Sequence, residues 1–220
     1  MPRRDAKQRS RAAFDRQARE YDTAPYGRHA RRLAGEVLAT VDAFDFATLL
    51  DVGCGTGAVL EAVLDARPRV SAWGVDLSPE MVAHARERLG GAAELQVADA
   101  ERLPFRDDCI DVVVCVDSLH HYPRPQAALA EMRRVTRPGG GLVIGEWRVV
   151  APLRQLMNAL FPLLPEGDVR VYTGRELEQL VAEAGYQEVR CRPAGVRGQL
   201  LAARAPLPGR TAEPIKETLT

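Results

Sequence analysis

This chain of 220 residues lacks a metal-binding cysteine pattern, a long apolar run and a net charge, and each absence argues against a class of function. Its four cysteines include no CxxC pair. The cysteine spacings match no zinc pattern, so we expect no metal site. The longest apolar runs, such as 112–116, are far shorter than the ~20 residues that span a membrane, so no span is expected. The 30 basic and 30 acidic residues leave no net charge. The overall charge therefore favours neither nucleic acid nor an anionic membrane as a partner.

Both ends of the chain are expected to be tails. Residues 1–8 are basic, but no apolar stretch follows them as in a secretory signal, so they predict a flexible basic tail. Residues 206–220 contain prolines and polar side chains and predict a loose C-terminal tail. The intervening 9–205 is expected to form one domain, because 46% hydrophobic and 27% charged residues are typical of a globular protein. Without a targeting signal, we expect a cytoplasmic protein with reduced thiols.

Apolar runs alternate with helical spacing along this domain. Short apolar runs predict strands at 47–52, 70–76, 94–99, 110–117, 142–147, 186–192 and 198–204. Apolar spacing and capping residues such as Ser78 and Thr173 predict helices at 9–20, 28–41, 58–67, 79–89, 126–135 and 174–184. Residues 137–141 predict a turn, and 150–172 are expected to be the least regular part of the chain.

This alternation predicts an α/β fold: a Rossmann-like, doubly wound, mostly parallel seven-stranded sheet with helices on both faces. The last two predicted strands are joined too tightly for a helical crossover, so they must form a hairpin. One terminal strand should therefore run antiparallel to its neighbours.

The strongest local signal is LLDVGCGTGA at 49–58, where a predicted strand ends in a glycine-rich loop and a helix follows. Gly53, Gly55 and Gly57 let the backbone turn sharply and approach a ligand closely. Asp76 ends the next predicted strand, where an acidic side chain can accept both ribose hydroxyls of a cofactor. The alternative interpretation of Asp76 is a turn or helix-capping aspartate.

Two classes of cofactor fit this loop. GCGTGA satisfies the dinucleotide pattern GxGxxG/A, so an NAD-dependent oxidoreductase is one hypothesis. Asp51 precedes Gly53 closely, and its carboxylate would repel a pyrophosphate in a low-dielectric cleft. The same carboxylate attracts S-adenosylmethionine, which carries a sulfonium and an ammonium group and no phosphate. The charge of Asp51 therefore favours S-adenosylmethionine.

Four motifs follow one another in the sequence: LLDVGCGTG, VDLSPEM, VADAERLPF and DSLHHYPRPQAALAEMRRVTRPGGGLVI. Together they resemble the class I S-adenosylmethionine-dependent methyltransferases, of the small-molecule group that includes the ubiquinone and menaquinone methyltransferases. The resemblance runs from about 14 to 203 and implies methyl transfer to a small-molecule acceptor through an oxygen, nitrogen or carbon nucleophile. A protein of this fold that binds the cofactor without methyl transfer is a further alternative.

The resemblance implies roles at the methionine end of the cofactor. Gly53, Cys54 and Gly55 would line the methionine part, with Asp51 near its ammonium group. Val116, at the end of the fourth predicted strand, would lie near the reacting sulfonium. Small residues simply fit such a loop, so no chemistry is assigned to the Cys54 thiol.

The resemblance also implies roles at the nucleoside end. Asp76 would hold the ribose, with Leu77 and Met81 against the adenine. Asp99 would accept a hydrogen bond from the adenine amine, and Ala100 would supply a backbone contact. The alternative for Asp99 is a turn residue at the end of a strand.

Residues 9–41 are expected to form lid helices over the cofactor. The run FDRQAREYD is similar to the family's lid helix, whose tyrosine covers the methionine part. Here that tyrosine is Tyr21, with Tyr26 close by, and an aromatic face beside a sulfonium gains about 0.5–2 kcal/mol. The alternative is that both tyrosines pack on an amphipathic helix.

The methyl acceptor is less clearly specified. His120 and His121 are the candidate bases, because histidine titrates near neutral pH; alternatively, a histidine packs near the cofactor. His84 is expected to be exposed, and so is His29, although His29 begins a helix near the mouth of the site and could alternatively touch the substrate. Apolar residues within 148–172 suggest a hydrophobic or aromatic acceptor, although they could equally pack over the sheet edge: Leu153, Leu156, Met157, Leu160, Phe161 and Leu163. The lack of an Asp-Pro-Pro-Tyr type motif counts against DNA methylation, and nothing specifies an oligomeric state.

Overall fold

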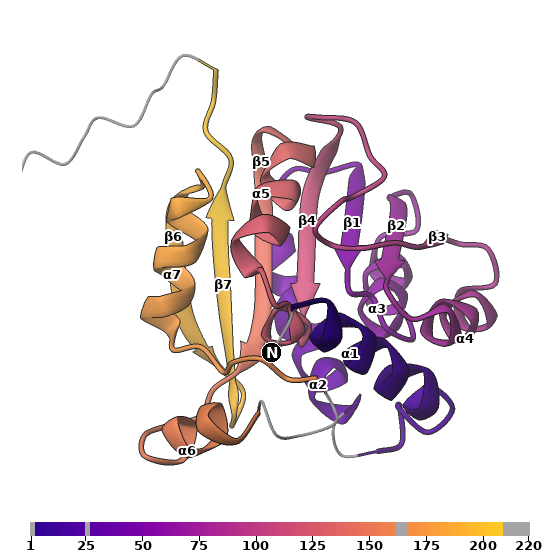
Figure 1. Cartoon of the computed structure of the whole chain (residues 1–220). Helices are drawn as coiled ribbons and strands as arrows, with labels where there is room; N and C mark the ends of the chain where they lie inside the picture. The colour runs from indigo at the N-terminus through magenta and orange to yellow at the C-terminus, as the bar shows by residue number, and fades with distance from the viewer. Residues whose placement is uncertain (1–2, 25–26, 162–166, 209–220) are drawn as a thin grey trace, which may run out of the picture.

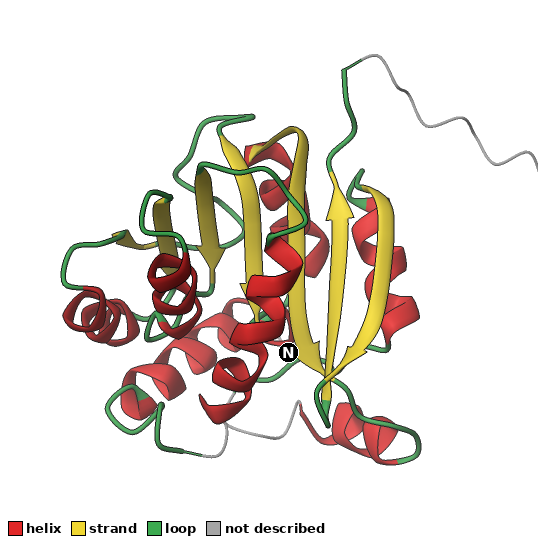
Figure 2. Ribbon diagram, turned by 180° about the vertical axis from the view of Figure 1, so that it is seen from behind, coloured by secondary structure: helices red, strands yellow, loops and turns green. Residues whose placement is uncertain are grey.

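The computed structural model describes residues 3–24, 27–161 and 167–208. Tyr26, Leu163 and most of the predicted C-terminal tail lie outside these ranges. One sheet crosses the whole molecule, with helices on both of its faces (Figure 1, and from behind in Figure 2). Within the described ranges, no helix is long and apolar enough to cross a membrane.

The seven strands lie in the order β3-β2-β1-β4-β5-β7-β6. They are β1 Thr48–Val52, β2 Ser71–Asp76, β3 Glu94–Val97, β4 Ile110–Val116, β5 Thr136–Trp147, β6 Gln187–Ala194 and β7 Gly198–Arg204. Strands β1 to β5 pair in parallel, and β7 runs antiparallel to both β5 and β6. The predicted α/β class and antiparallel terminal strand are confirmed. Chain order reverses between β1 and β4, which is where open α/β sheets bind ligands.

The helices are α1 Arg3–Gln17, α2 Gly27–Val41, α3 Ala58–Ala66, α4 Pro79–Leu89, α5 Pro125–Val135, α6 Leu153–Leu160 and α7 Gly174–Glu183, with a short 3₁₀ helix, η1 Leu119–His121. Ser78 caps α4, because its Oγ accepts a hydrogen bond from the Met81 amide. Thr173 and Glu176 form a capping box at the start of α7. Both caps agree with the sequence prediction, so local chemistry fixes where these two helices begin.

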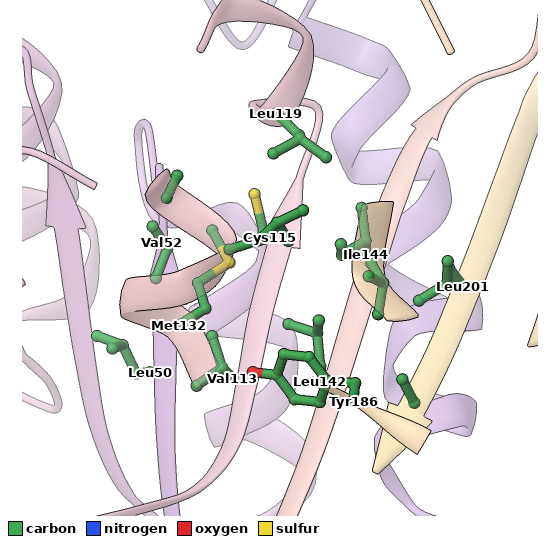
Figure 3. Packing of buried hydrophobic residues seen from close by; sticks show 14 of the residues in the cluster. Leu50, Val52, Val113, Cys115, Leu119, Met132, Leu142, Ile144, Tyr186 and Leu201 are labelled. Atoms are coloured by element: carbon green, nitrogen blue, oxygen red, sulfur yellow. The ribbon is translucent and has the colours of Figure 1, made fainter. Parts of the chain in front are cut away.

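Strand β4 is buried along its whole length and separates two hydrophobic clusters. Val113 and Cys115 belong to the cluster under α5 and α7, which also contains Met132 and Tyr186 (Figure 3). The neighbouring valines of β4 belong to the cluster under α2 and α3. Because both faces are covered, β4 is a continuous apolar run in the sequence. These two layers hold the carboxyl ends of β1, β2 and β4 in fixed relative positions.

The N-terminus differs from the prediction of a flexible tail over 1–8, because α1 already begins at Arg3. Lys7 explains this difference: its Nζ lies 2.7 Å from a carboxylate oxygen of Asp99 and 2.7 Å from one of Glu101. Contacts that are remote in sequence therefore order a segment whose composition alone predicts fraying.

One prediction in the second half of the chain is also wrong. Strand β5 begins at Thr136 and runs through 137–141, where a turn was expected. Its glycines permit close packing, since a Cβ at Gly140 would lie 2.6 Å from the Asp111 carbonyl and one at Gly141 would lie 2.7 Å from the Phe44 ring. The segment 150–172, expected to be the least regular part of the chain, contains one helix among its described residues, α6.

Candidate active site

A cavity opens at the carboxyl ends of β1, β2 and β4 and is covered by α1. It encloses about 980 Å³ outside the protein atoms, the solvent at its mouth included. Eleven of the twelve residues predicted to bind the cofactor line it: Tyr21, Asp51, Gly53, Cys54, Gly55, Asp76, Leu77, Met81, Asp99, Ala100 and Val116. The motifs that are separate in the sequence thus meet in one place.

The glycine loop has the sharp turn that the sequence predicts. The Gly53 and Cys54 amides both donate to the Val75 carbonyl, at 2.8 and 3.0 Å, which ties the loop to the end of β2. Gly53 has φ 79° and no room for a side chain, because a Cβ would lie 1.9 Å from Ser118 Oγ. Gly55 has φ 52°, and a Cβ there would meet nothing within 4 Å. The backbone at Gly55 is therefore open to the cavity.

Gly57 is the predicted cofactor residue that does not line the cavity. It precedes α3 with φ 81°, and a Cβ would lie 3.2 Å from the side chains of Ala85 and Leu89 on α4. Its small size serves the packing of α3 on α4, as the third glycine of such loops does for helix packing. A cofactor contact by Gly57 therefore stays a prediction, which the cavity wall does not support.

Asp51 is buried at the end of β1 and lines the cavity. Burial, reinforced by repulsion from Asp76, raises the pKa of the Asp51 carboxyl to about 8. Its Oδ1 is buried and has no hydrogen-bond partner among the described residues. An unpaired buried carboxylate oxygen beside a cavity fits a ligand that brings a positive charge.

Asp76 has the turn role that was the alternative interpretation of its position in the sequence. Its Oδ2 accepts from the Gly55 amide at 2.9 Å and its Oδ1 from the Ser78 amide at 2.8 Å. Burial raises the pKa of Asp76, and these backbone hydrogen bonds oppose that rise. Asp76 is therefore a turn aspartate that shapes the loop. Since each carboxylate oxygen can accept a second hydrogen bond, it also remains available to a ligand in the cavity.

Acidic side chains outnumber basic ones in the cavity wall. Six lining residues are acidic: Asp22, Asp51, Asp76, Asp99, Glu101 and Asp117. Among the described lining residues, Lys7 is the one lysine or arginine, and its ammonium group is paired with Asp99 and Glu101. Such a wall repels phosphates and attracts cations. Sequence reasoning missed Lys7, since nothing in the basic N-terminal run marks one residue for this position.

Helix α1 lies near the lower ends of the strands in Figure 1, and its residues Lys7, Ser10 and Phe14 line the cavity. The Phe14 ring lies edge-on to Tyr21 at 6.0 Å and to His121 at 4.8 Å between centroids. Ser78 Oγ donates to Asp15 at 2.5 Å. Thr56 Oγ1 donates to Asp22 at 2.8 Å, so the lid is fastened to the loops below it.

A second cavity of about 680 Å³ adjoins the first. Four residues line both cavities: Phe14, Tyr21, Asp117 and His121. The rest of its wall is largely apolar and comes from β5, α6 and the segment before α7, including Trp147, Met157, Phe161 and Val171. The alternative that the apolar residues of 148–172 pack over the sheet edge fails for three of them, because Leu153, Leu156 and Leu160 are exposed.

The two candidate bases have different environments. His120 Nδ1 lies 2.6 Å from Glu146 Oε2. Burial lowers the pKa of His120, but the Glu146 and Asp168 carboxylates outweigh burial and raise it to about 9. Burial and the charge of His120 lower the pKa of His121, despite the nearby Asp168. His121 lines both cavities, whereas His120 lines only the second.

His29 is not the exposed residue that the sequence predicts. Its Nδ1 lies 2.7 Å from Asp117 Oδ2, and its side chain is only 15% exposed. Asp117 has φ 49°, lines both cavities and was not identified from the sequence as a site residue. Its partner is remote in the chain, so no local motif reveals the pair. The Cys54 thiol is buried with its pKa well above the usual value, in agreement with the absence of an assigned chemistry.

Comparisons with known proteins bear on which cofactor this cavity takes. Residues 50–144 match a family model described as a methyltransferase domain. The chain is 32% identical over 189 residues to malonyl-[acyl-carrier protein] O-methyltransferase from Geobacter sulfurreducens, covering 81% of this chain and 70% of that protein.

Two further comparisons, with a curated relative and with a solved structure, agree with this match. The chain is 36% identical over 123 residues to a ubiquinone/menaquinone biosynthesis C-methyltransferase from Burkholderia orbicola, covering 53% of this chain and 51% of that protein. The chain thus spans only about half of that relative's length. The solved structure of a SAM-dependent methyltransferase from Aquifex aeolicus superposes with a TM-score of 0.68 at 22% identity, covering 86% of this chain and 97% of that one.

These likenesses decide between the two cofactors that the glycine loop left open. The cavity agrees with them, because an unpaired carboxylate on an acidic wall suits a cationic nucleoside and opposes a diphosphate. The chain therefore belongs to the class I S-adenosylmethionine-dependent methyltransferases, and its cofactor is S-adenosylmethionine.

Proposed function

We propose that this protein transfers a methyl group from S-adenosylmethionine to a small, largely apolar acceptor in the second cavity. The observation that carries this proposal is that the two cavities adjoin and share Phe14, Tyr21, Asp117 and His121. A donor in the first cavity and an acceptor in the second would meet across these side chains. Alignment of this kind can supply several kcal/mol of the barrier, up to ~7–11 in ideal cases.

Residues of the first cavity would hold the cofactor from end to end. Asp51 would pair with the ammonium group, and Asp76 would accept from the ribose hydroxyls. The remaining contacts are the predicted ones that line the cavity: Tyr21, Gly53, Cys54, Gly55, Leu77, Met81, Asp99, Ala100 and Val116. Support for Asp51 comes from its unpaired buried oxygen.

Bound S-adenosylmethionine supplies a methyl group that is already activated by the positive charge on sulfur. The chain then has to exclude water, orient the acceptor and handle its proton. Helix α1 would exclude water by covering the first cavity. Trp147 would orient the acceptor, because its indole Nε1 is buried in the wall of the second cavity without a partner among the described residues. His120 and His121 lie in the same wall, where an acceptor proton would be released.

The experiment is a transfer assay with methyl-labelled S-adenosylmethionine and a panel of acceptors. The names of the two curated relatives specify O- and C-methylation, so the panel should contain carboxylic acids, phenols and electron-rich ring carbons, with an amine series and duplex DNA. We expect label in an apolar oxygen or carbon nucleophile. Label in DNA alone would contradict the proposal, as would tight cofactor binding without transfer to any member.

A further inference from the structure

Three potential metal ligands converge in the wall of the second cavity. His120 and His121 lie on η1, and Asp168 comes from the segment between α6 and α7. One ligand atom from each side chain lies within 4.8 Å of those of the other two. The backbone fixes this meeting, because the Val169 amide donates to the His120 carbonyl at 2.8 Å.

The hydrogen bonds around the cluster leave its inner atoms available. His120 Nδ1 lies 2.6 Å from Oε2 of Glu146 on β5. The other ring nitrogen of His120, Nε2, therefore faces the cluster and lies 3.9 Å from Asp168 Oδ1. His121 Nδ1 lies 3.0 Å from the same Asp168 oxygen. That nitrogen is nevertheless buried without a well-aligned hydrogen bond to any described residue. A carboxylate behind a ligating imidazole is the usual support of a metal-bound histidine.

We propose that His120, His121 and Asp168 bind one divalent first-row transition metal ion, with Glu146 positioning His120. Two imidazoles and one carboxylate suit Zn²⁺, Mn²⁺, Fe²⁺, Co²⁺ or Ni²⁺, whereas Mg²⁺ and Ca²⁺ prefer more oxygen ligands. All three ligands line the second cavity, so the remaining coordination positions open toward the acceptor.

The bound ion would add a chemical role to the proposed function. This role rests on the proposed function, which places the acceptor in the second cavity. An acceptor hydroxyl bound to the ion loses its proton to solvent more readily than a free one, as metal-bound water does. The oxygen lone pair forms the bond to the methyl carbon, and sulfur keeps the electron pair of the bond that breaks. The site thus selects acceptors with a hydroxyl or enol oxygen beside an apolar body.

The test is a Co²⁺ titration of the full chain after removal of metal by a chelator, followed by visible absorption and by calorimetry without cofactor. We expect one equivalent of Co²⁺ to bind with new d–d absorption bands. Asp168→Asn should weaken binding at least about tenfold, and Glu146→Gln about 10–100-fold. The matched control is His84→Gln, which removes a partly exposed histidine of α4 paired with Glu87 and should bind like wild type.

Either of two results would overturn the inference. Absence of d–d bands, or equal Co²⁺ affinity in wild type and in an Asp168→Asn protein with unchanged circular dichroism, shows that the cluster is only an imidazolium–carboxylate network. Because neither readout needs S-adenosylmethionine or an acceptor, failure here leaves the transfer assay untouched. Conversely, if Co²⁺ binds but no acceptor is methylated in the transfer assay, the metal site is supported and the proposed function is contradicted.

Discussion

The two cavities are built in different ways. The floor of the first consists of strand ends and the loops that follow them, so most of its predicted contacts belong to short motifs such as 49–58 or 76–81, and α1 covers this floor. The second is assembled from η1, the end of β5, α6 and the segment before α7, and its key pairs lie far apart in the chain. The wall of the first is acidic, and that of the second combines aromatic rings with imidazoles. A shared cofactor fixes the first, whereas the second is free to differ with the acceptor.

The largest expected effect follows removal of the charge that distinguishes the first cavity. Asp51→Asn should weaken S-adenosylmethionine binding by about two to three orders of magnitude, because loss of one partner from a buried ion pair costs about 3–5 kcal/mol. Calorimetric titration with the cofactor measures the loss. Asp65→Asn, an exposed change on α3, is the control. Unchanged affinity in Asp51→Asn would mean that shape and not charge defines this cavity.

The Asp51 carboxyl also predicts how the affinity for S-adenosylmethionine depends on pH. Its pKa of about 8 without ligand leaves it mostly protonated at pH 7, and a bound ammonium group favours the ionised form. Binding should therefore release a proton, and affinity should rise up to about tenfold per pH unit toward pH 8. Above about pH 8 the cofactor amine loses its own charge, so affinity should fall again.

Calorimetry in two buffers of different ionisation enthalpy detects the proton released on cofactor binding, and Asp51→Asn should abolish that release.

The stability of the ligand-free protein should change with pH in the opposite direction to cofactor affinity. A folded-state pKa raised above its value of about 3.9 in the unfolded chain makes the ligand-free protein less stable as pH rises from about 4 to 8. Ligand-free Asp51→Asn should therefore resist urea better than wild type at pH 7. A flat pH profile for binding would refute the assigned ionisation.

Asp76→Ala should have the next largest effect, on affinity and stability together. It removes the acceptor proposed for the ribose and leaves the Gly55 and Ser78 amides without their partner. We expect about 10–100-fold weaker cofactor binding and a free energy of unfolding lower by about 1–3 kcal/mol. Cofactor titration and urea unfolding measure the two losses. Loss of stability with full affinity would reduce Asp76 to its turn role.

The smallest change tests the second cavity alone. Trp147→Phe keeps an aromatic ring and removes the unpaired indole N–H, so the KM of an oxygen-containing acceptor should rise about 3–10-fold with cofactor affinity unchanged. Steady-state kinetics and cofactor titration separate the two. Trp73→Phe, whose ring packs on Phe105 away from the cavity wall, is the matched control. A parallel loss of cofactor affinity would show that the two cavities are not independent.

The same contrast governs what the sequence could predict. The positions of most strands, their mostly parallel pairing, the caps at Ser78 and Thr173 and most of the first cavity follow from local patterns, because strand, loop and helix are adjacent in the chain. The cofactor contact predicted at Gly57 finds no support in the cavity wall, since spacing alone does not distinguish a glycine that faces a ligand from one that packs against a helix.

The missed features depend on contacts that are remote in sequence. Lys7 orders α1 through Asp99 and Glu101. The His29–Asp117 pair joins α2 to the end of β4. The absence of a metal pattern was judged on spacing, whereas Asp168 reaches the histidine pair only through the fold. Such contacts leave no periodicity and no motif to detect.

One close approach links the lid to the acceptor side. Gly167 has φ 79°, and a Cβ there would lie 2.7 Å from the Ser10 amide nitrogen of α1, so this segment and the lid touch backbone to backbone. Asp168 follows Gly167 directly, so a displacement of α1 would also disturb the segment that carries Asp168. A side chain at position 167 would push this segment and the helix apart, which makes the missing side chain a condition for their contact.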